Sequence, residues 1–171
     1  MLRTSVGGFT TLVWDYELGA YTLPAVGIVC FLAGTLVETA DGPKPIEQIA
    51  VGDRIWSGDG ERYEIERAQV VALPGGVVTN LVCIELNAEQ IWCTGEHRFW
   101  VCDKGWVRAK RLEPGFLLVS EDWKPVPVTG VSFVTTNVPT RVYNLTVTGG
   151  HSFFVGKTRV LVHNMMSGGQ K

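Results

Sequence analysis

The chain contains the stretch Ile46-Glu-Gln-Ile49-Ala-Val-Gly52-Asp-Arg-Ile55, and a related stretch follows it, Ala109-Lys-Arg-Leu112-Glu-Pro-Gly115-Phe-Leu-Leu118. The offset between them is 63 residues, and the same offset places Cys93 on Cys30. In both stretches a short apolar turn leads to a glycine and then to a strand-like segment. Two such copies indicate a duplicated β-unit with approximate two-fold symmetry. The alternative is a coincidence between two ordinary turn-then-strand segments.

Short strand-like segments separated by turn signals follow one another from Cys30 onward. β-branched residues are frequent between the turns, and this alternation is typical of an all-β domain. The only helix-like pieces are residues 44–49 and their echo, residues 107–112. We therefore expect three parts: an upstream segment (1–29), an all-β domain (30–164) and a short polar tail (165–171).

The composition suits a compact globular domain and gives no sign of nucleic-acid binding. Of the 171 residues, 46% are hydrophobic and 19% are charged, and the formal net charge is −2. That charge offers no bulk attraction to a polyanion. The four cysteines do not form an obvious disulfide framework for a domain of this size.

Residues 18–37 carry no charge and are just long enough to span a bilayer as a helix. Pro24, three glycines and two threonines interrupt this run, so we expect no membrane segment. A secretory signal also fits poorly, because Asp15 and Glu17 precede the run. The alternative, a membrane-anchored β-domain, would put Cys30 in lipid and make it useless as a nucleophile.

Asn164 is a candidate for self-cleavage. Its side-chain amide can attack its own backbone carbonyl carbon, which forms a succinimide and breaks the Asn164–Met165 bond. Holding the two groups together makes this an oriented intramolecular reaction, for which effective molarities reach about 10⁵–10⁸ M. His163 and His151 can supply the proton or the hydrogen bond that the reaction needs. Taken alone, a His-Asn dipeptide is an ordinary polar strand end.

Cys30 is the second candidate, because a cysteine side chain can attack the carbonyl of the residue before it. The Val29–Cys30 amide would then become a thioester. The thiolate is the nucleophile, so we expect Cys30 to be partly activated. The alternative is a small buried apolar side chain, as most free cysteines are.

The segment Cys93-Thr94-Gly95-Glu96-His97-Arg98 supplies a third element. A threonine three residues before a histidine, at a strand end, can place hydroxyl and imidazole on one turn. We expect Thr94 to bind the oxygen of one peptide group and His97 to donate to its nitrogen. The alternative is metal binding by Cys93, His97 and Cys102, whose spacing supplies no convincing fourth ligand. We therefore expect neither a metal nor another cofactor.

These elements resemble the blocks of the Hint superfamily, which includes inteins, hedgehog autoprocessing domains, bacterial intein-like domains and the pre-toxin Hint domains of polymorphic toxins. All three histidines of the chain fall within them. The resemblance spans residues 30–164 in four ordered segments: Cys30–Asp53, Thr94–Trp100, Val142–Val147 and His151–Asn164. It is closest to the pre-toxin and bacterial intein-like members. It implies a flat, horseshoe-like all-β fold with pseudo-two-fold symmetry, in which the two ends of the chain meet at one centre.

The resemblance also implies a catalytic role for six residues by position. One is the acyl-shift nucleophile, two assist that shift, and three carry the asparagine cyclisation: Cys30, then Thr94 and His97, then His151, His163 and Asn164. The implied function is single-turnover, self-catalysed cleavage of the chain's own flanking segments by a monomer. The alternative is an inert Hint-fold remnant that serves as a linker or carrier. The sequence does not decide whether the domain is cytoplasmic or part of an exported bacterial protein.

Two departures from the intein pattern bear on this function. Splicing inteins are followed by Ser, Thr or Cys, whereas Met165 follows Asn164 and cannot form an ester or thioester. We therefore expect cleavage at one or both ends without efficient ligation. Asn144 stands where many inteins carry an aspartate, so a charge that could tune Cys30 is missing.

Overall fold

The computed structural model describes residues 3–5, 9–11, 13–15, 20–22 and 29–163. Strands make up most of the described chain, together with two single-turn 3-10 helices, η1 (Ile46–Gln48) and η2 (Ala109–Arg111). The expected all-β class is confirmed. In the upstream segment, β1 (Arg3–Ser5) pairs with β2 (Phe9–Thr11), and β3 (Val13–Asp15) pairs with β4 (Ala20–Thr22).

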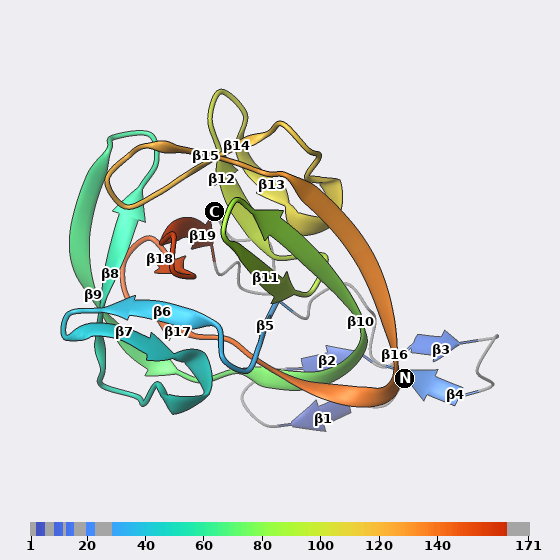
Figure 1. Ribbon diagram of the computed structural model, residues 1–171. Coiled ribbons are helices and arrows are strands. Elements are labelled where there is room, and N and C mark those ends of the chain that lie inside the picture. Colours follow the sequence, from blue (N-terminus) through green and yellow to red (C-terminus); the bar gives the residue numbers. More distant parts are fainter. Residues whose placement is uncertain (1–2, 6–8, 12, 16–19, 23–28, 164–171) are drawn as a thin grey trace.

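Two sheets build the domain from residue 29 onward (Figure 1). One closes into a barrel with the order β10-β11-β5-β16, formed by β10 (Gly75–Leu86), β11 (Glu89–Cys93), β5 (Phe31–Leu32) and β16 (Gly130–Tyr143). The other has 11 strands and the order β15-β14-β12-β19-β18-β6-β8-β9-β17, with β13 beside β12 and β7 beside β6.

The strands of the larger sheet are short apart from the β8–β9 hairpin. Its members are β6 (Leu36–Thr39), β7 (Gly42–Pro45), β8 (Arg54–Asp59), β9 (Glu64–Ala72), β12 (Arg98–Val101), β13 (Gly105–Arg108), β14 (Leu117–Val119), β15 (Pro125–Pro127), β17 (Thr146–Val147), β18 (Ser152–Val155) and β19 (Val160–His163). In Figure 1 the long β10–β16 pair forms one arm of the molecule and β8–β9 the other, with β5, β18 and β19 between them. This is the expected horseshoe.

The two related sequence stretches fold in the same way, which supports the duplicated β-unit. Gly52 and Gly115 both adopt a left-handed backbone, with φ of 96° and 95°, a conformation that costs glycine little. Their amides donate to equivalent partners, Gly52 N to Val70 O at 2.9 Å and Gly115 N to Val128 O at 2.8 Å. The two copies therefore share their backbone hydrogen bonds, as the expected pseudo-two-fold symmetry requires.

The same repeat supplies matched side chains to the core. Buried apolar residues occupy equivalent positions in the two copies, in the pairs Ile46 and Ala109, Ile49 and Leu112, Ile55 and Leu118, and Val70 and Val128. Burying an aliphatic side chain of this size contributes about 1.5–3 kcal/mol. The repeated sequence pattern is thus explained by two copies that pack their apolar faces into one core.

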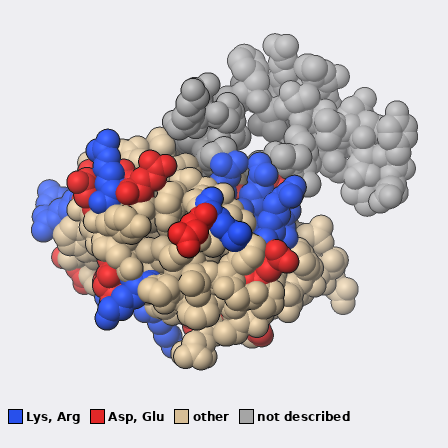
Figure 2. Space-filling view, turned by 90° about the horizontal axis from the view of Figure 1, so that it is seen from above, with Lys and Arg blue, Asp and Glu red and all other residues tan. Residues whose placement is uncertain are grey.

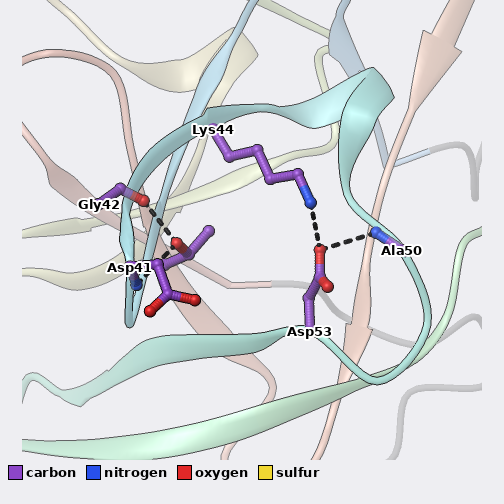
Figure 3. Close-up of polar contacts among 6 residues, drawn as sticks. Asp41, Gly42, Lys44, Ala50 and Asp53 are labelled. Atoms are coloured by element: carbon purple, nitrogen blue, oxygen red, sulfur yellow. Dashed lines mark hydrogen bonds and ion pairs between the residues drawn. The ribbon is translucent and has the colours of Figure 1, made fainter.

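A polar cluster fixes the loop between η1 and β8 (Figure 3). One carboxylate oxygen of Asp53 accepts hydrogen bonds from Lys44 Nζ at 2.8 Å and from Ala50 N at 2.9 Å. The hydrogen bond from Lys44 lowers the pKa of Asp53, and the amide of Ala50 lowers it further. On the face in Figure 2, the Lys and Arg side chains are interspersed with Asp and Glu.

Replacing Asp53 by asparagine should lower the free energy of unfolding by at most about 1 kcal/mol, because ion pairs at this exposure are weak. The amide oxygen of asparagine can still accept from Ala50 N, so the loop keeps one of its two contacts. Urea unfolding followed by circular dichroism measures the difference. A loss of several kcal/mol would mean that the cluster is part of the folding core and would contradict this assignment.

Candidate active site

Cys30 and Thr94 lie side by side where β5 meets β11. The pairing of Phe31 with Cys93 sets this register. Cys30 N donates to Thr94 Oγ1 at 3.0 Å, and Thr94 N donates to Cys30 O at 2.9 Å. The hydroxyl therefore touches the nitrogen of the Val29–Cys30 peptide bond, whereas the sequence predicted the oxygen side.

The Cys30 thiol is not activated in this state. Cys30 is only 3% exposed, and burial raises the pKa of its thiol to about 12. Desolvation disfavours the thiolate and causes this shift of the pKa. The prediction of a partly activated Cys30 therefore does not hold here, because spacing along the chain says nothing about how completely a thiol is desolvated.

His97 ends the turn that begins at Thr94, and its ring is completely buried. Phe31, the residue after Cys30, packs against the imidazole with ring centroids 4.0 Å apart, and Phe99 and Phe153 complete the aromatic surround at 6.2 and 6.4 Å. Burial lowers the pKa of His97 to about 3, against the opposing effects of the Arg98 backbone and the Asn144 side chain. His97 is therefore neutral at physiological pH, with one nitrogen able to donate and one able to accept.

Asn144 joins the same site from the end of β16. Its neighbour Tyr143 pairs with Phe31, and this antiparallel register carries Asn144 to the level of Cys30. Asn144 is 4% exposed, its Oδ1 accepts from Leu145 N at 2.8 Å, and its side chain raises the pKa of His97. In the sequence, Asn144 stood out only as a departure from the intein pattern, and it was not among the expected site residues.

His151 and His163 form a second group, with ring centroids 6.4 Å apart. His163 also packs on Trp106 at 4.8 Å. Its strand β19 pairs with β12 through Arg98 and His163, which brings this group beside His97. Burial lowers the pKa of His163 to about 4, and the charges of His151 and Arg98 lower it further.

The backbone and the polar contacts around His151 fix its position. His151 adopts a left-handed conformation with φ of 60°, which is uncommon for a residue other than glycine. The next residue, Ser152, is buried, and its hydroxyl lies 2.8 Å from the hydroxyl of Ser57. Strand β18 therefore begins at a fixed point next to the imidazole.

Asn164 lies outside the described residues, so the structure gives only the position of the residue before it, His163. The other five predicted residues come from three distant parts of the chain and lie in two neighbouring groups, Cys30 with Thr94 and His97, and His151 with His163. Among the residues that the structure describes, no three His, Cys, Asp or Glu side chains form a group that could hold a metal ion, the proposed Cys93–His97–Cys102 set included. Within the same residues, no helix is long and apolar enough to cross a membrane.

A family model for the pretoxin Hint domain matches residues 36–165. The chain belongs to the pretoxin Hint family. An iron–sulfur cluster assembly SufBD family protein of Mycobacterium tuberculosis is 36% identical to this Hint domain over 110 residues. That match covers 64% of the chain but only 12% of the relative, so the chain spans a small part of that protein.

Solved structures agree with this assignment of the Hint domain. A bacterial intein-like domain from Clostridium thermocellum is 32% identical, with a TM-score of 0.77, and the match covers 79% of this chain and 98% of that domain. A DnaB intein from Synechocystis is 21% identical, with a TM-score of 0.67, and the match covers 80% of this chain and 99% of the intein. The gp41-1 intein is 22% identical, with a TM-score of 0.64 and coverages of 80% and 98%. The similarity to the DnaB intein and to the gp41-1 intein shows a shared fold alone.

The buried, neutral His97 should make this Hint domain less stable in acid. Its folded pKa of about 3 lies below the usual 6.5, so between these values the unfolded chain binds a proton that the folded chain does not. Stability should therefore fall as the pH drops below 6.5, by up to about 1.4 kcal/mol per pH unit from this group. Urea unfolding of the parent and of His97→Phe at pH 7 and pH 4.5 isolates the histidine's share.

The phenylalanine variant keeps an aromatic ring in the aromatic surround but has nothing to titrate. We expect acidification to lower the free energy of unfolding of the parent more than that of His97→Phe. A difference that is independent of pH would mean that His97 takes up its proton in the folded state as easily as in the unfolded one, and would contradict the burial argument.

Proposed function

We propose that this Hint domain cuts its own chain in a single turnover, at Val29–Cys30 and at Asn164–Met165. The observation that carries the proposal is the contact of 3.0 Å between the Cys30 amide nitrogen and Thr94 Oγ1. A hydroxyl at that point touches the atom that must leave when the peptide bond breaks. The buried His97 on the same turn adds a neutral proton donor and acceptor beside it.

At the upstream bond, Cys30 Sγ attacks the carbonyl carbon of Val29. A thioester forms, the bond from Val29 C to Cys30 N breaks, and the thiol proton ends on the new amine. The Thr94 hydroxyl can rotate to donate to that nitrogen as its lone pair develops. Water or an added thiol then attacks the thioester and releases residues 1–29.

At the downstream bond, Asn164 Nδ2 attacks the carbonyl carbon of Asn164. The succinimide closes, the bond to Met165 breaks, and the amine of Met165 takes the proton that the amide loses. His163 precedes Asn164 directly and lies 6.4 Å from His151, ring centroid to centroid, so both imidazoles belong to this step. Met165 cannot accept an acyl group, and we infer cleavage without efficient ligation.

The second candidate is an inert Hint-fold linker or carrier, and one observation favours it. Burial raises the pKa of the Cys30 thiol to about 12, so almost no thiolate is present at neutral pH. An acyl shift from this state is slow unless the site supplies a base. This candidate and self-cleavage make opposite predictions for the mass of the chain over time.

The test is the intact mass of the full chain with a different tag at each end, followed over time with and without dithiothreitol. Loss of the first 29 residues, accelerated by the thiol, supports the acyl shift. Loss of the last seven residues supports asparagine cyclisation. A full-length mass that stays constant under both conditions would overturn the proposal in favour of the inert linker.

A further inference from the structure

The turn from Thr94 to His97 has a structural counterpart in the first copy of the repeat, the turn from Leu32 to Thr35. The offset at this turn is 62 residues, one fewer than in the stretches around Gly52 and Gly115, so Cys93 matches Phe31 and not Cys30 as the sequence predicted. His97 N donates to Thr94 O at 3.2 Å, and Thr35 N donates to Leu32 O at 3.3 Å. The carbonyl that ends each turn then accepts from the first residue of the following 3-10 helix, with 2.7 Å from Ala109 N to His97 O and 2.8 Å from Ile46 N to Thr35 O. Both turns are thus tied to a 3-10 helix by the same backbone bonds.

The second residue of each 3-10 helix also holds the turn through its side chain, but with different chemistry in the two copies. In the first copy the carboxylate of Glu47 accepts from the backbone amide of Gly34. In the second copy the equivalent helix residue is Lys110, and it pairs with the carboxylate of Glu96, which occupies the position of Gly34. We call this contact between the 3-10 helix and the turn the side-chain clamp: Glu47 with Gly34 in the first copy, and Lys110 with Glu96 in the second. In the second copy the clamp is an ion pair.

We propose that Glu96 is a positioning residue that holds Thr94 and His97 against the Val29–Cys30 bond. This inference rests on the proposed self-cleavage. The Glu96 carboxylate binds two cations from one short segment, Lys110 Nζ and Arg108 Nε, the latter at 2.9 Å. Glu96 is the least exposed of the three, at 18% for its side chain, so its charge is the best shielded from water.

The segment that carries these cations is itself in close contact with the turn. Lys110 N donates to Gly95 O at 3.0 Å, and a Cβ atom placed on Gly95 would lie 3.2 Å from Lys110 Cβ. A side chain at position 95 would therefore crowd Lys110. Two backbone bonds and two ion pairs join the turn to the segment around η2, with Glu96 as the anionic partner in both pairs.

Glu96 also lies next to a pair of like charges. Arg98 and Arg108 are cross-strand partners in β12 and β13, and like charges opposite each other destabilise a sheet. The bond from Arg108 to Glu96 offsets that repulsion. Without the carboxylate, three cations would surround the turn, and Arg108 and Lys110 would lose the partner that holds them against it.

The chemical test is to compare Glu96→Gln with Asp53→Asn in the doubly tagged full chain. Asp53 is the matched control, because it forms an ion pair with Lys44 at 2.8 Å in the first copy, away from the proposed chemistry. We expect Glu96→Gln to slow thiol-induced release of residues 1–29 about 10- to 100-fold, since small displacements of positioned groups cost that much. The downstream cut should stay near the parent rate, and Asp53→Asn should change neither.

A double-mutant cycle shows whether Glu96 acts through the clamp. Lys110→Met removes one of its two cations and should slow the upstream cut less than Glu96→Gln does. The double variant should be no slower than Glu96→Gln alone. Additive losses, or equal slowing of both cuts alongside a lower melting temperature, would reduce Glu96 to a structural role and overturn the proposal.

A readout that does not need cleavage separates this inference from the proposed function. In a Cys30→Ala chain the amide of residue 30 is retained and no acyl shift can occur. Amide hydrogen exchange at residue 30 reports its bond to Thr94 Oγ1. Adding Glu96→Gln removes the charged partner of Arg108 and Lys110, and loss of a hydrogen bond to a charged group shifts an equilibrium by about tenfold or more. The exchange at residue 30 should therefore become about tenfold faster, whereas Asp53→Asn should leave it unchanged. Unchanged exchange overturns the positioning role even if the parent chain cleaves.

Discussion

Asn164→Ala should abolish release of residues 165–171 while the upstream cut continues at the parent rate. Alanine has no side-chain nitrogen, so the succinimide cannot form and the Asn164–Met165 bond has no internal nucleophile. The intramolecular reaction owes its rate to effective molarities of about 10⁵–10⁸ M, and all of that advantage is lost with the amide. The measurement is the intact mass of the tagged chain over days, with and without dithiothreitol.

The reciprocal variant is the control for this experiment. Cys30→Ala removes the sulfur nucleophile and should block the upstream cut alone, leaving the tail to be released as before. Together the two variants assign one cut to each nucleophile. Release of the tail from the Asn164→Ala chain would show that an outside protease makes the downstream cut, and the asparagine mechanism would be wrong.

The upstream cut should accelerate about tenfold for each unit of pH, and therefore about 100-fold between pH 7 and pH 9, because the thiolate fraction grows in that proportion below the pKa of the thiol. Burial raises that pKa to about 12, so no plateau is expected within this range. The neutral His97 is a weak base and does not change the slope. Release of residues 1–29 is measured by mass at thiol concentrations high enough that the rate no longer depends on them.

A plateau near neutral pH would contradict this expectation. It would mean that the reacting state of Cys30 is more acidic than the buried thiol described here, through a base or a rearrangement of the site. Circular dichroism at each pH provides the control, since the fold must stay intact for the rates to be compared. Asn164→Ala is the suitable background, because only one cut then contributes to the mass change.

The repeat was the part of the fold that the sequence revealed best. A turn, a glycine and a strand are local features, so the 63-residue offset carried over directly into matched hydrogen bonds and matched buried positions such as Ile49 and Leu112. The short helical pieces were expected for the same reason and form η1 and η2. The pairing of distant strands, such as β12 with β19, depends on tertiary contacts that no local pattern encodes.

The site was predicted less completely, because burial and orientation decide its chemistry. The Thr-x-x-His spacing correctly placed Thr94 and His97 on one turn, but not the face of the peptide bond that the hydroxyl touches. Spacing also gave no sign that Cys30 is desolvated rather than activated. Asn144 reaches the site only through the β16–β5 register, and Glu96 only through the clamp to η2.

One measurement tests most directly whether both cuts share a centre beside His97. In a chain that carries both Cys30→Ala and Asn164→Ala, neither bond can be cut, and nuclear Overhauser contacts can be measured from the His97 ring protons to the amide protons of residues 30 and 165. We predict contacts to both. Contacts to residue 30 alone, with the amide of residue 165 close to residues on the opposite face, would separate the two peptide bonds and contradict a single active centre.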